Sequence, residues 1–291
     1  MPVSRRDFLR ATSALAAAFG LRAMGPGSVM ASEEGASVVW LQAQGCTGCS
    51  ISLLNSIAAG TAEDLIPSTV NLAYHPTLMA SAGPNAVAAA TAAKDTGGYV
   101  LVVEGAVPTG ADGKYCYLWP GTTARDGVRE FAAKAEHIVA VGTCAAYGGI
   151  PASVPAGGAN PTGARGVSRV VEGGSIINVP GCPPHPDWIV GTIASLLGGV
   201  VPARDAFGRP DAYFSDTIHD QCYYDAEDYC LEEQGCKGEI THGNCPGLRW
   251  NGGTLGWRNV NWCVGARSPC QGCTHPEFPD GMLPFHAEVE D

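Results

Sequence analysis

The chain has few basic residues. Its 291 residues include 17 lysines and arginines against 28 aspartates and glutamates, which gives a formal net charge of −11. A surface of this sign cannot neutralise phosphates, so nucleic acid is excluded as an expected partner, whereas a basic protein would complement it. Charged residues make up only 15% of the chain and hydrophobic residues 45%. This balance excludes a disordered polymer and indicates one or two packed domains.

Long apolar stretches are missing beyond the first 31 residues. No later segment of about 18 apolar residues exists, and residues 284–291 are polar. We therefore expect the mature protein to have no membrane-spanning helix of its own. No internal repeat of about 20–50 residues is present either, so a repeat architecture is not expected.

Residues 1–31 have the features of an export signal. Arg5 and Arg6 precede an alanine-rich apolar stretch from Ala11 to Leu21, with small residues before Ala31. The segment resembles a twin-arginine signal, which exports proteins that have already folded. We predict a periplasmic protein; an ordinary secretory signal with a chance arginine pair is the alternative. Removal of the segment, with its four arginines and one aspartate, would take the formal charge to −14.

Short apolar strands alternate with helical patterns between about residues 36 and 200. The expected strands cover residues 37–41, 70–74, 99–103, 138–141 and 176–179. The expected helices cover residues 51–59, with Ser50 as N-cap, 85–94, 124–135 and 188–197. This alternation predicts right-handed βαβ crossovers and an α/β fold. We expect an open parallel sheet in flavodoxin-like order, with helices on both faces.

Beyond Val201 the pattern changes. Gly and Pro recur, periodicity fades, and acidic residues outnumber basic ones 15 to 6. Such a segment buries too little apolar surface to order itself by packing alone, and bound metal clusters would supply the missing cross-links. We therefore expect a flavodoxin-like domain over residues 32–200 and a largely irregular iron–sulfur domain over residues 201–291.

Twelve cysteines are the most informative residues of the chain. Four of them come directly after predicted strands: Cys46, Cys49, Cys144 and Cys182. Ligands of open α/β sheets gather outside the carboxyl ends of the strands, so these four thiolates are expected to meet there. Neighbouring glycines would let the backbone approach a bulky cofactor and offer amides to its sulfurs. Four thiolates suit one [4Fe–4S] cluster.

Two further sets of four possible ligands follow in the C-terminal region. One set combines a histidine with three cysteines: His219, Cys222, Cys230 and Cys236. The other has four cysteines: Cys245, Cys263, Cys270 and Cys273. A histidine in place of a thiolate removes one negative charge and tends to raise the reduction potential. Only Cys116 stays outside the three sets, and we expect it to be an ordinary thiol.

Other uses of these residues stay open at this point. An even number of cysteines in an exported chain fits six disulfides, although strand-end positions are not needed for them. Structural zinc fits the Cys270–Cys273 pair, but its further ligands lie farther off than in a zinc ribbon. Nickel held between this pair and Cys46–Cys49 would leave the other cysteines unexplained. Glu104 ends the most apolar strand and is either a proton relay or a satisfied structural acid.

The chain resembles the small subunit of nickel–iron hydrogenases over its whole mature length. The motifs that carry the resemblance are Cys46-Thr47-Gly48-Cys49, Val103-Glu104-Gly105, Gly142-Thr143-Cys144-Ala145 and Pro180-Gly181-Cys182-Pro183-Pro184. The resemblance implies an oxidoreductase whose nickel–iron site lies on a separate large subunit, in a heterodimer. It also implies that the first set holds the proximal cluster, the His219 set the distal cluster and the Cys245 set the medial cluster.

The medial set departs from the commonest family pattern. Cys263 stands where the family usually has a proline, so that four cysteines are available instead of three. The set would then hold a [4Fe–4S] cluster, as in the nickel–iron–selenium branch, with [3Fe–4S] as the alternative. We expect three clusters that pass electrons from hydrogen oxidation to a c-type cytochrome. The cytochrome is expected to dock on acidic residues around the distal set: Asp220, Asp225, Glu227, Asp228, Glu232 and Glu233. A stand-alone exported polyferredoxin is the alternative function.

Overall fold

The computed structural model describes residues 37–55, 71–154, 158–224, 229–250 and 261–287. All of these residues belong to one compact unit, 34–291. The predicted export signal lies outside the described residues. The expected boundary near residue 200 falls inside the compact unit, so the division into 32–200 and 201–291 remains a prediction.

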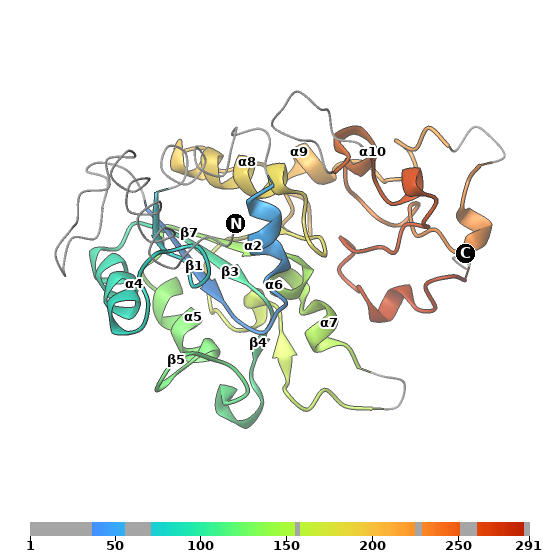
Figure 1. Cartoon of the computed structure of the whole chain (residues 1–291). Coiled ribbons are helices and arrows are strands. Elements are labelled where there is room, and N and C mark those ends of the chain that lie inside the picture. The colour runs from blue at the N-terminus through green and yellow to red at the C-terminus, as the bar shows by residue number, and fades with distance from the viewer. Residues whose placement is uncertain (1–36, 56–70, 155–157, 225–228, 251–260, 288–291) are drawn as a thin grey trace, which may run out of the picture. The chain divides into compact units, whose positions relative to one another are not determined.

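Five parallel strands form the central sheet (Figure 1). They are β1 (Val38–Gln42), β2 (Leu72–Tyr74), β3 (Val100–Glu104), β7 (His137–Val141) and β9 (Ile176–Val179). Their order across the sheet is β2-β1-β3-β7-β9, and all neighbouring pairs are parallel. Renumbered along the chain, this is the 2-1-3-4-5 order of flavodoxin-like sheets. The predicted fold class is confirmed.

The strand register brings the carboxyl ends of the inner strands to one edge. Glu104, the last residue of β3, lies opposite Gln42 of β1 and Val141 of β7. Val141 in turn lies opposite Val179, the last residue of β9. The segments that follow these strands therefore leave the sheet at the same edge, and they are the segments that carry the first four cysteines.

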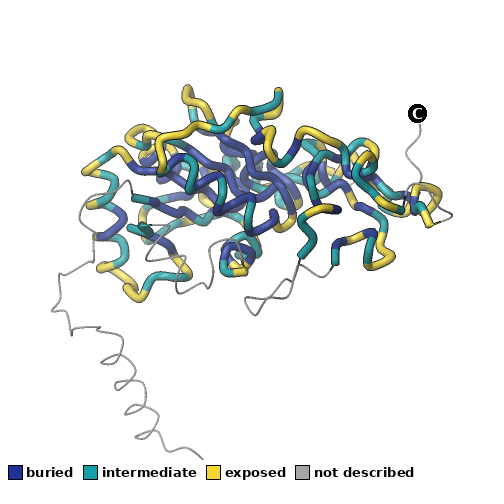
Figure 2. Tube along the Cα trace, turned by 90° about the horizontal axis from the view of Figure 1, so that it is seen from above, coloured by how far each residue is buried: buried dark blue, intermediate teal, exposed yellow. Residues whose placement is uncertain are grey.

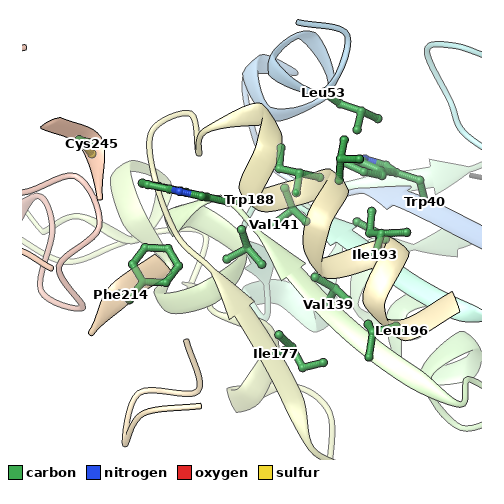
Figure 3. Packing of buried hydrophobic residues seen from close by; sticks show 14 of the residues in the cluster. Trp40, Leu53, Val139, Val141, Ile177, Trp188, Ile193, Leu196, Phe214 and Cys245 are labelled. Carbon is green, nitrogen blue, oxygen red and sulfur yellow. The ribbon is translucent and has the colours of Figure 1, made fainter. Parts of the chain in front are cut away.

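Helices cover both faces of the sheet, as the alternation predicts (Figure 1). α2 (Gly48–Leu53) and α8 (Pro186–Leu197) pack on one face, where Trp40, Val139 and Ile193 lie in one core (Figure 3). α4 (Pro84–Thr96) and α5 (Ala124–Ala132) pack on the other face. Successive strand residues alternate between the two cores, and the central strand β3 is buried throughout, whereas the edge strand β2 is half-buried (Figure 2). The sequence pattern of apolar strands follows from this burial.

The first helix differs from its prediction. α2 begins at Gly48, and its N-cap is Thr47, which has a left-handed φ of 67°. Ser50 lies inside the helix, fully buried, and its hydroxyl donates to the carboxylate of Glu104. The prediction of Ser50 as the N-cap was therefore wrong, because its hydrogen-bond partner comes from a distant strand. Residues 56–59 of the predicted helix lie outside the described residues.

Two small antiparallel strand pairs were not predicted from the sequence, because strands of two or three residues are too short for an alternation of apolar and polar residues to be recognised. β4 (Val107–Pro108) pairs with β8 (Ala164–Arg165), and β5 (Tyr117–Trp119) pairs with β6 (Thr122–Thr123). Short helices also flank the sheet: η1 (Gly110–Gly113), α6 (Thr143–Tyr147), α7 (Gly149–Ala152) and η2 (Val167–Arg169).

The chain after α8 is largely irregular, as expected. Its described helices are one turn long: α9 (Asp211–Phe214), η3 (Glu232–Gln234), α10 (Cys245–Leu248), η4 (Val264–Ala266) and η5 (Asp280–Met282). Across the described ranges, no helix combines the length and apolarity needed to span a membrane.

Candidate functional site

All twelve cysteines lie in the described part of the chain, and every one of them is a free thiol. The structure therefore contains none of the six disulfides of the alternative interpretation. Grouped free cysteines are the residues that iron–sulfur clusters use as ligands.

The first group lies at the carboxyl edge of the sheet. Cys46 and Cys49 follow β1, Cys144 lies in α6 directly after β7, and Cys182 follows β9. Burial raises the pKa of the Cys49 thiol well above its ordinary value, and the charges of Glu104 and of the other three thiols raise it further. Mutual effects of this kind require the four sulfurs to lie near one another. The strand ends thus bring together the four cysteines that the sequence predicts to meet.

Glycines leave room for the sulfurs of this group. Gly142 has a φ of 85°, and a Cβ atom on it would lie 2.5 Å from Sγ of Cys49. A Cβ atom on Gly149 would lie 3.1 Å from Sγ of Cys144. The first distance is shorter than real Cβ atoms show, and the second is so tight that the Cys144 sulfur would have to shift. The backbone therefore packs directly on two of the four sulfurs, as a bulky sulfur-ligated group requires.

The group at the C-terminal end is the most deeply buried one. Cys245 and Cys270 are buried, and Cys245 begins α10 beside Trp188 and Phe214 (Figure 3). Burial raises the pKa of Cys245 well above its ordinary value, and the charges of Cys273, Cys270 and Cys263 raise it further. Burial also raises the pKa of Cys273 to about 12. The structure thus brings the four predicted cysteines of this group together.

The structure connects the third group, His219, Cys222, Cys230 and Cys236, less completely. The amide of Cys222 donates to the carbonyl of His219 at 2.9 Å. Cys230 raises the pKa of Cys236 as a minor cause after burial. The two halves meet at Gly238, where an added Cβ would lie 3.5 Å from both Sγ of Cys236 and the backbone nitrogen of His219. Nε2 of His219 lies 3.9 Å from a Glu239 oxygen.

Contacts between the groups place them in a row. The amide of Cys270 donates to Sγ of Cys236 at 3.3 Å, which joins the C-terminal group to the histidine-containing group. The backbone amide of Cys182 forms a hydrogen bond to the sulfur of Cys273, which joins the C-terminal group to the one at the sheet edge. The four-cysteine C-terminal group is thus the middle member, although it comes last in the sequence.

A buried carboxylate anchors the first group. Glu104 is 1% exposed. One of its oxygens accepts from the amides of Cys49 and Ser50 at 3.0 and 3.2 Å, and the other accepts from the Trp40 indole at 3.0 Å and from the Ser50 hydroxyl. Such a carboxylate is a satisfied structural acid that holds the start of α2. Of the two interpretations of Glu104, these contacts favour the structural one.

A histidine extends this network into the core. Nδ1 of His75 accepts from the amides of Thr77 and Leu78 at 3.1 and 3.2 Å, so the ring proton is on Nε2. Nε2 lies 3.2 Å from the hydroxyl of Ser50, which donates onward to Glu104. Burial lowers the pKa of His75 to about 4, so the ring is neutral at physiological pH.

The donor chemistry of the three groups fits iron–sulfur clusters. Crowded, buried thiols stay protonated unless a cation stabilises the thiolate form, and metal binding supplies that cation. Within the described ranges, no three His, Cys, Asp or Glu side chains are close enough to bind a single metal ion.

Sequence reasoning missed several residues of the site. Trp40, Ser50 and His75 complete the Glu104 network, and Thr143 bonds to the loops of two cysteine groups. The sequence signals were weak: a carboxylate at the end of an apolar strand, and a hydroxyl next to Cys144. The partners of Glu104 and Thr143 lie more than 30 residues away along the chain.

Two known families match the chain. Residues 46–196 match the family described as "NADH ubiquinone oxidoreductase, 20 Kd subunit". Residues 211–286 match the family that describes the C-terminal part of the NiFe/NiFeSe hydrogenase small subunit. Together the two matches span the three cysteine groups.

Individual relatives match over almost the full length. The chain is 40% identical to the periplasmic [NiFeSe] hydrogenase small subunit of Desulfomicrobium baculatum, covering 98% of this chain and 99% of the relative. It is 38% identical to the periplasmic [NiFe] hydrogenase small subunit of Solidesulfovibrio fructosivorans, covering 98% and 93%.

Solved structures give the same result. The Ni-Fe-Se hydrogenase from Desulfomicrobium baculatum, in its reduced, active form, superposes with a TM-score of 0.79 at 38% identity, covering 88% of this chain and all of that chain. The actinobacterial-type NiFe-hydrogenase from Ralstonia eutropha H16 superposes with a TM-score of 0.73 at 30% identity, covering 89% and 84%.

Proposed function

The chain belongs to the small subunits of the NiFe and NiFeSe hydrogenases, and we propose that it is the electron-transferring half of a periplasmic enzyme of this type. The observation that carries the proposal is the row of three cysteine-rich groups that starts at the sheet edge. In this role the chain accepts the two electrons of each hydrogen molecule oxidised on a separate large subunit and delivers them singly to an acceptor.

Twelve residues are proposed as cluster ligands. The proximal set is Cys46, Cys49, Cys144 and Cys182; the medial set is Cys245, Cys263, Cys270 and Cys273; and the distal set is His219, Cys222, Cys230 and Cys236. Each set would hold one [4Fe–4S] cluster, which supplies reversible one-electron storage when bound. The protein orients the sulfurs, donates amide hydrogen bonds to them and excludes water from the buried ones.

The surface around the proximal set supports a protein partner there. Cys46 and Cys182 are exposed, although a cluster that hands on electrons needs protection from solvent. Ile51 of α2 and Ile150 of α7 flank the set and are 53% and 57% exposed. Exposed apolar residues beside exposed ligands indicate a surface that a permanent partner covers. We propose that this partner is the hydrogenase large subunit, in a heterodimer.

The surface near the distal set supports a cationic electron acceptor. Asp220, Glu232 and Glu233 are exposed there. We propose that they dock a lysine-rich c-type cytochrome by electrostatic steering. The association rate is then expected to fall as ionic strength rises, and reversal of Glu232 and Glu233 to lysine is expected to lower it further. Glu172→Lys, at an exposed site before β9, is the matched control.

Periplasmic location and export by the twin-arginine route complete the proposal. Two relatives are named as periplasmic proteins, and the paired arginines of residues 1–31 have the features of that signal. A fusion of residues 1–31 to a reporter that must fold before export is expected to reach the periplasm. Arg5→Lys together with Arg6→Lys is expected to leave the reporter in the cytoplasm.

Metal and subunit analysis of the native protein tests the main proposal. We expect the small subunit to be purified together with a larger nickel-containing subunit and to carry about twelve irons, four for each cluster. Cys182→Ser is expected to lose about four irons, whereas Cys116→Ser, outside the three sets, is expected to keep all of them. A stable, iron-loaded chain that purifies alone would favour the polyferredoxin alternative. Colourless protein would contradict both functions.

A further inference from the structure

Thr143 lies where two cysteine groups meet. It is the first residue of α6, directly before Cys144, and it is 1% exposed. A hydroxyl this deeply buried costs free energy unless it is hydrogen-bonded, so its partners indicate why it is there.

Thr143 binds Gly181 in both directions. The amide of Thr143 donates to the carbonyl of Gly181 at 3.0 Å, and the amide of Gly181 donates to the hydroxyl of Thr143 at 2.8 Å. These two bonds close a ring between the segment after β7 and the segment after β9. Because Cys144 and Cys182 are the next residues on the two segments, the ring fixes two proximal ligands relative to each other.

The same hydroxyl also reaches the medial group. While it accepts a hydrogen bond from the Gly181 amide, it donates its own proton to the carbonyl of Cys273, 130 residues farther along the chain. A hydroxyl can accept and donate at once, which a methyl group in the same place cannot do. Thr143 thus connects the proximal and medial loops through one atom.

A second contact lies beside this one. The backbone amide of Cys182 forms a hydrogen bond to the sulfur of Cys273. The loops are therefore adjacent at their ligand residues and not only at the Thr143 hydroxyl. The backbone of Cys273, held by Thr143, decides where its sulfur lies relative to Cys182.

We propose that Thr143 is a positioning residue for electron transfer, whose hydroxyl sets the separation of the proximal and medial ligands. This inference rests on the proposed function, because it assumes that both groups hold clusters. Electron tunnelling weakens steeply with distance, so a small drift of the Cys273 loop would slow transfer between the two sites. Loss of a partner that orients a metal ligand commonly costs about 10–100-fold in activity.

The test compares three variants in the complete heterodimer. Thr143→Val keeps the shape of the side chain and removes the hydroxyl, and Thr143→Ser keeps the hydroxyl and removes the methyl group. Thr192→Val is the matched control, because Thr192 is also a buried threonine but its hydroxyl has no hydrogen-bond partner among the described residues. The measurements are iron content, the magnetic interaction between neighbouring clusters in electron paramagnetic resonance, and the rate of electron transfer from hydrogen to an artificial acceptor.

Thr143→Val is expected to retain its iron, to change the magnetic interaction between the proximal and medial clusters, and to slow electron transfer by about tenfold. Thr143→Ser is expected to restore both properties, and Thr192→Val to match the wild type. Wild-type magnetic interaction and rate in an iron-loaded Thr143→Val protein would overturn the inference. If the valine variant does not accumulate, Thr143→Ala, which also lacks the hydroxyl, takes its place under the same criteria.

Failure of the proposed function gives a different result. Wild-type protein without clusters contradicts the function itself, before any variant is compared. Clusters in the wild type with no effect of Thr143→Val contradict only the role of Thr143.

Discussion

The carboxylate of Glu104 accepts a hydrogen bond from the backbone amide of Cys49 at 3.0 Å. The two residues are 55 positions apart in sequence and meet because β1 and β3 are neighbours in the sheet. The bond gives the conformation of a proposed cluster ligand a direct dependence on the central strand.

Replacement of Glu104 by glutamine tests this dependence. The amide group of glutamine turns one acceptor into a donor, which would face either two backbone amides or the Trp40 indole. At least one buried donor then loses its partner, and we expect Glu104→Gln to lower the free energy of unfolding by about 1–3 kcal/mol. Iron content of the purified complex is expected to fall with it.

Glu130→Gln is the matched control for Glu104→Gln. Glu130 pairs with Lys94 at an exposed site, and its loss is expected to change the free energy of unfolding by less than about 0.5 kcal/mol. Denaturant-induced unfolding of the anaerobic complex measures both variants. Equal, small effects of the two substitutions would show that Glu104 does not anchor the ligand loop.

Alanine substitutions at Gly142 and Gly121 distinguish the cost of an unfavourable backbone conformation from the cost of a clash with a cysteine sulfur. Both have a φ of 85°, but only a Cβ on Gly142 would meet Cys49 Sγ, at 2.5 Å, while the site of Gly121 is open. Substitution by alanine is expected to cost each site about 1–3 kcal/mol for the positive φ. Only Gly142→Ala is expected to lose about four irons as well. Iron analysis distinguishes the two effects, and full iron content in Gly142→Ala would contradict the close packing.

His75 is expected to make stability depend on pH. Its pKa is lowered from 6.5 to about 4 by burial, so the unfolded chain binds a proton over a range in which the folded chain does not. Its stabilising contribution is fully present above pH 6.5 and is lost as the pH falls toward 4. Between about pH 7 and pH 5 we expect a loss of about 2 kcal/mol from this residue.

His75→Gln removes the titrating ring, so the corresponding part of the pH dependence is expected to disappear. Unfolding free energies of the wild type and the variant at several pH values between about 5 and 7 give the comparison. An unchanged slope in the variant would assign the pH dependence to other groups.

Cys263→Pro tests the fourth ligand of the medial set. The variant restores the three-cysteine pattern common in the family, so a [3Fe–4S] cluster is expected in place of [4Fe–4S]. Iron content is then expected to fall from about twelve to about eleven. Iron analysis with electron paramagnetic resonance of the oxidised protein detects the change. Loss of about four irons would show that the group cannot hold a cluster with three cysteines.

Much of the fold followed from local sequence. A strand of a parallel sheet is buried on both faces, so its sequence is a continuous apolar run. Residues 99–103 and 138–141 are such runs, and both could be predicted as strands from the sequence. The membership of the proximal set also followed, because a parallel sheet brings the ends of its strands to one edge. The grouping of the histidine-containing set could not be predicted from strand positions in the same way, because its members lie outside regular helices and strands.

The sequence by itself determined the parallel α/β fold, the family and the three groups of candidate ligands, since apolar periodicity and cysteine spacing are local properties. Tertiary structure placed the last group in the sequence between the other two in space, as the family resemblance implies. It also decided that the Ser50 hydroxyl donates a hydrogen bond to Glu104 instead of capping a helix, and that the Thr143 hydroxyl bonds to both Gly181 and Cys273. The physical reason is that a hydrogen bond depends on distances of a few tenths of an ångström, which packing of remote segments sets.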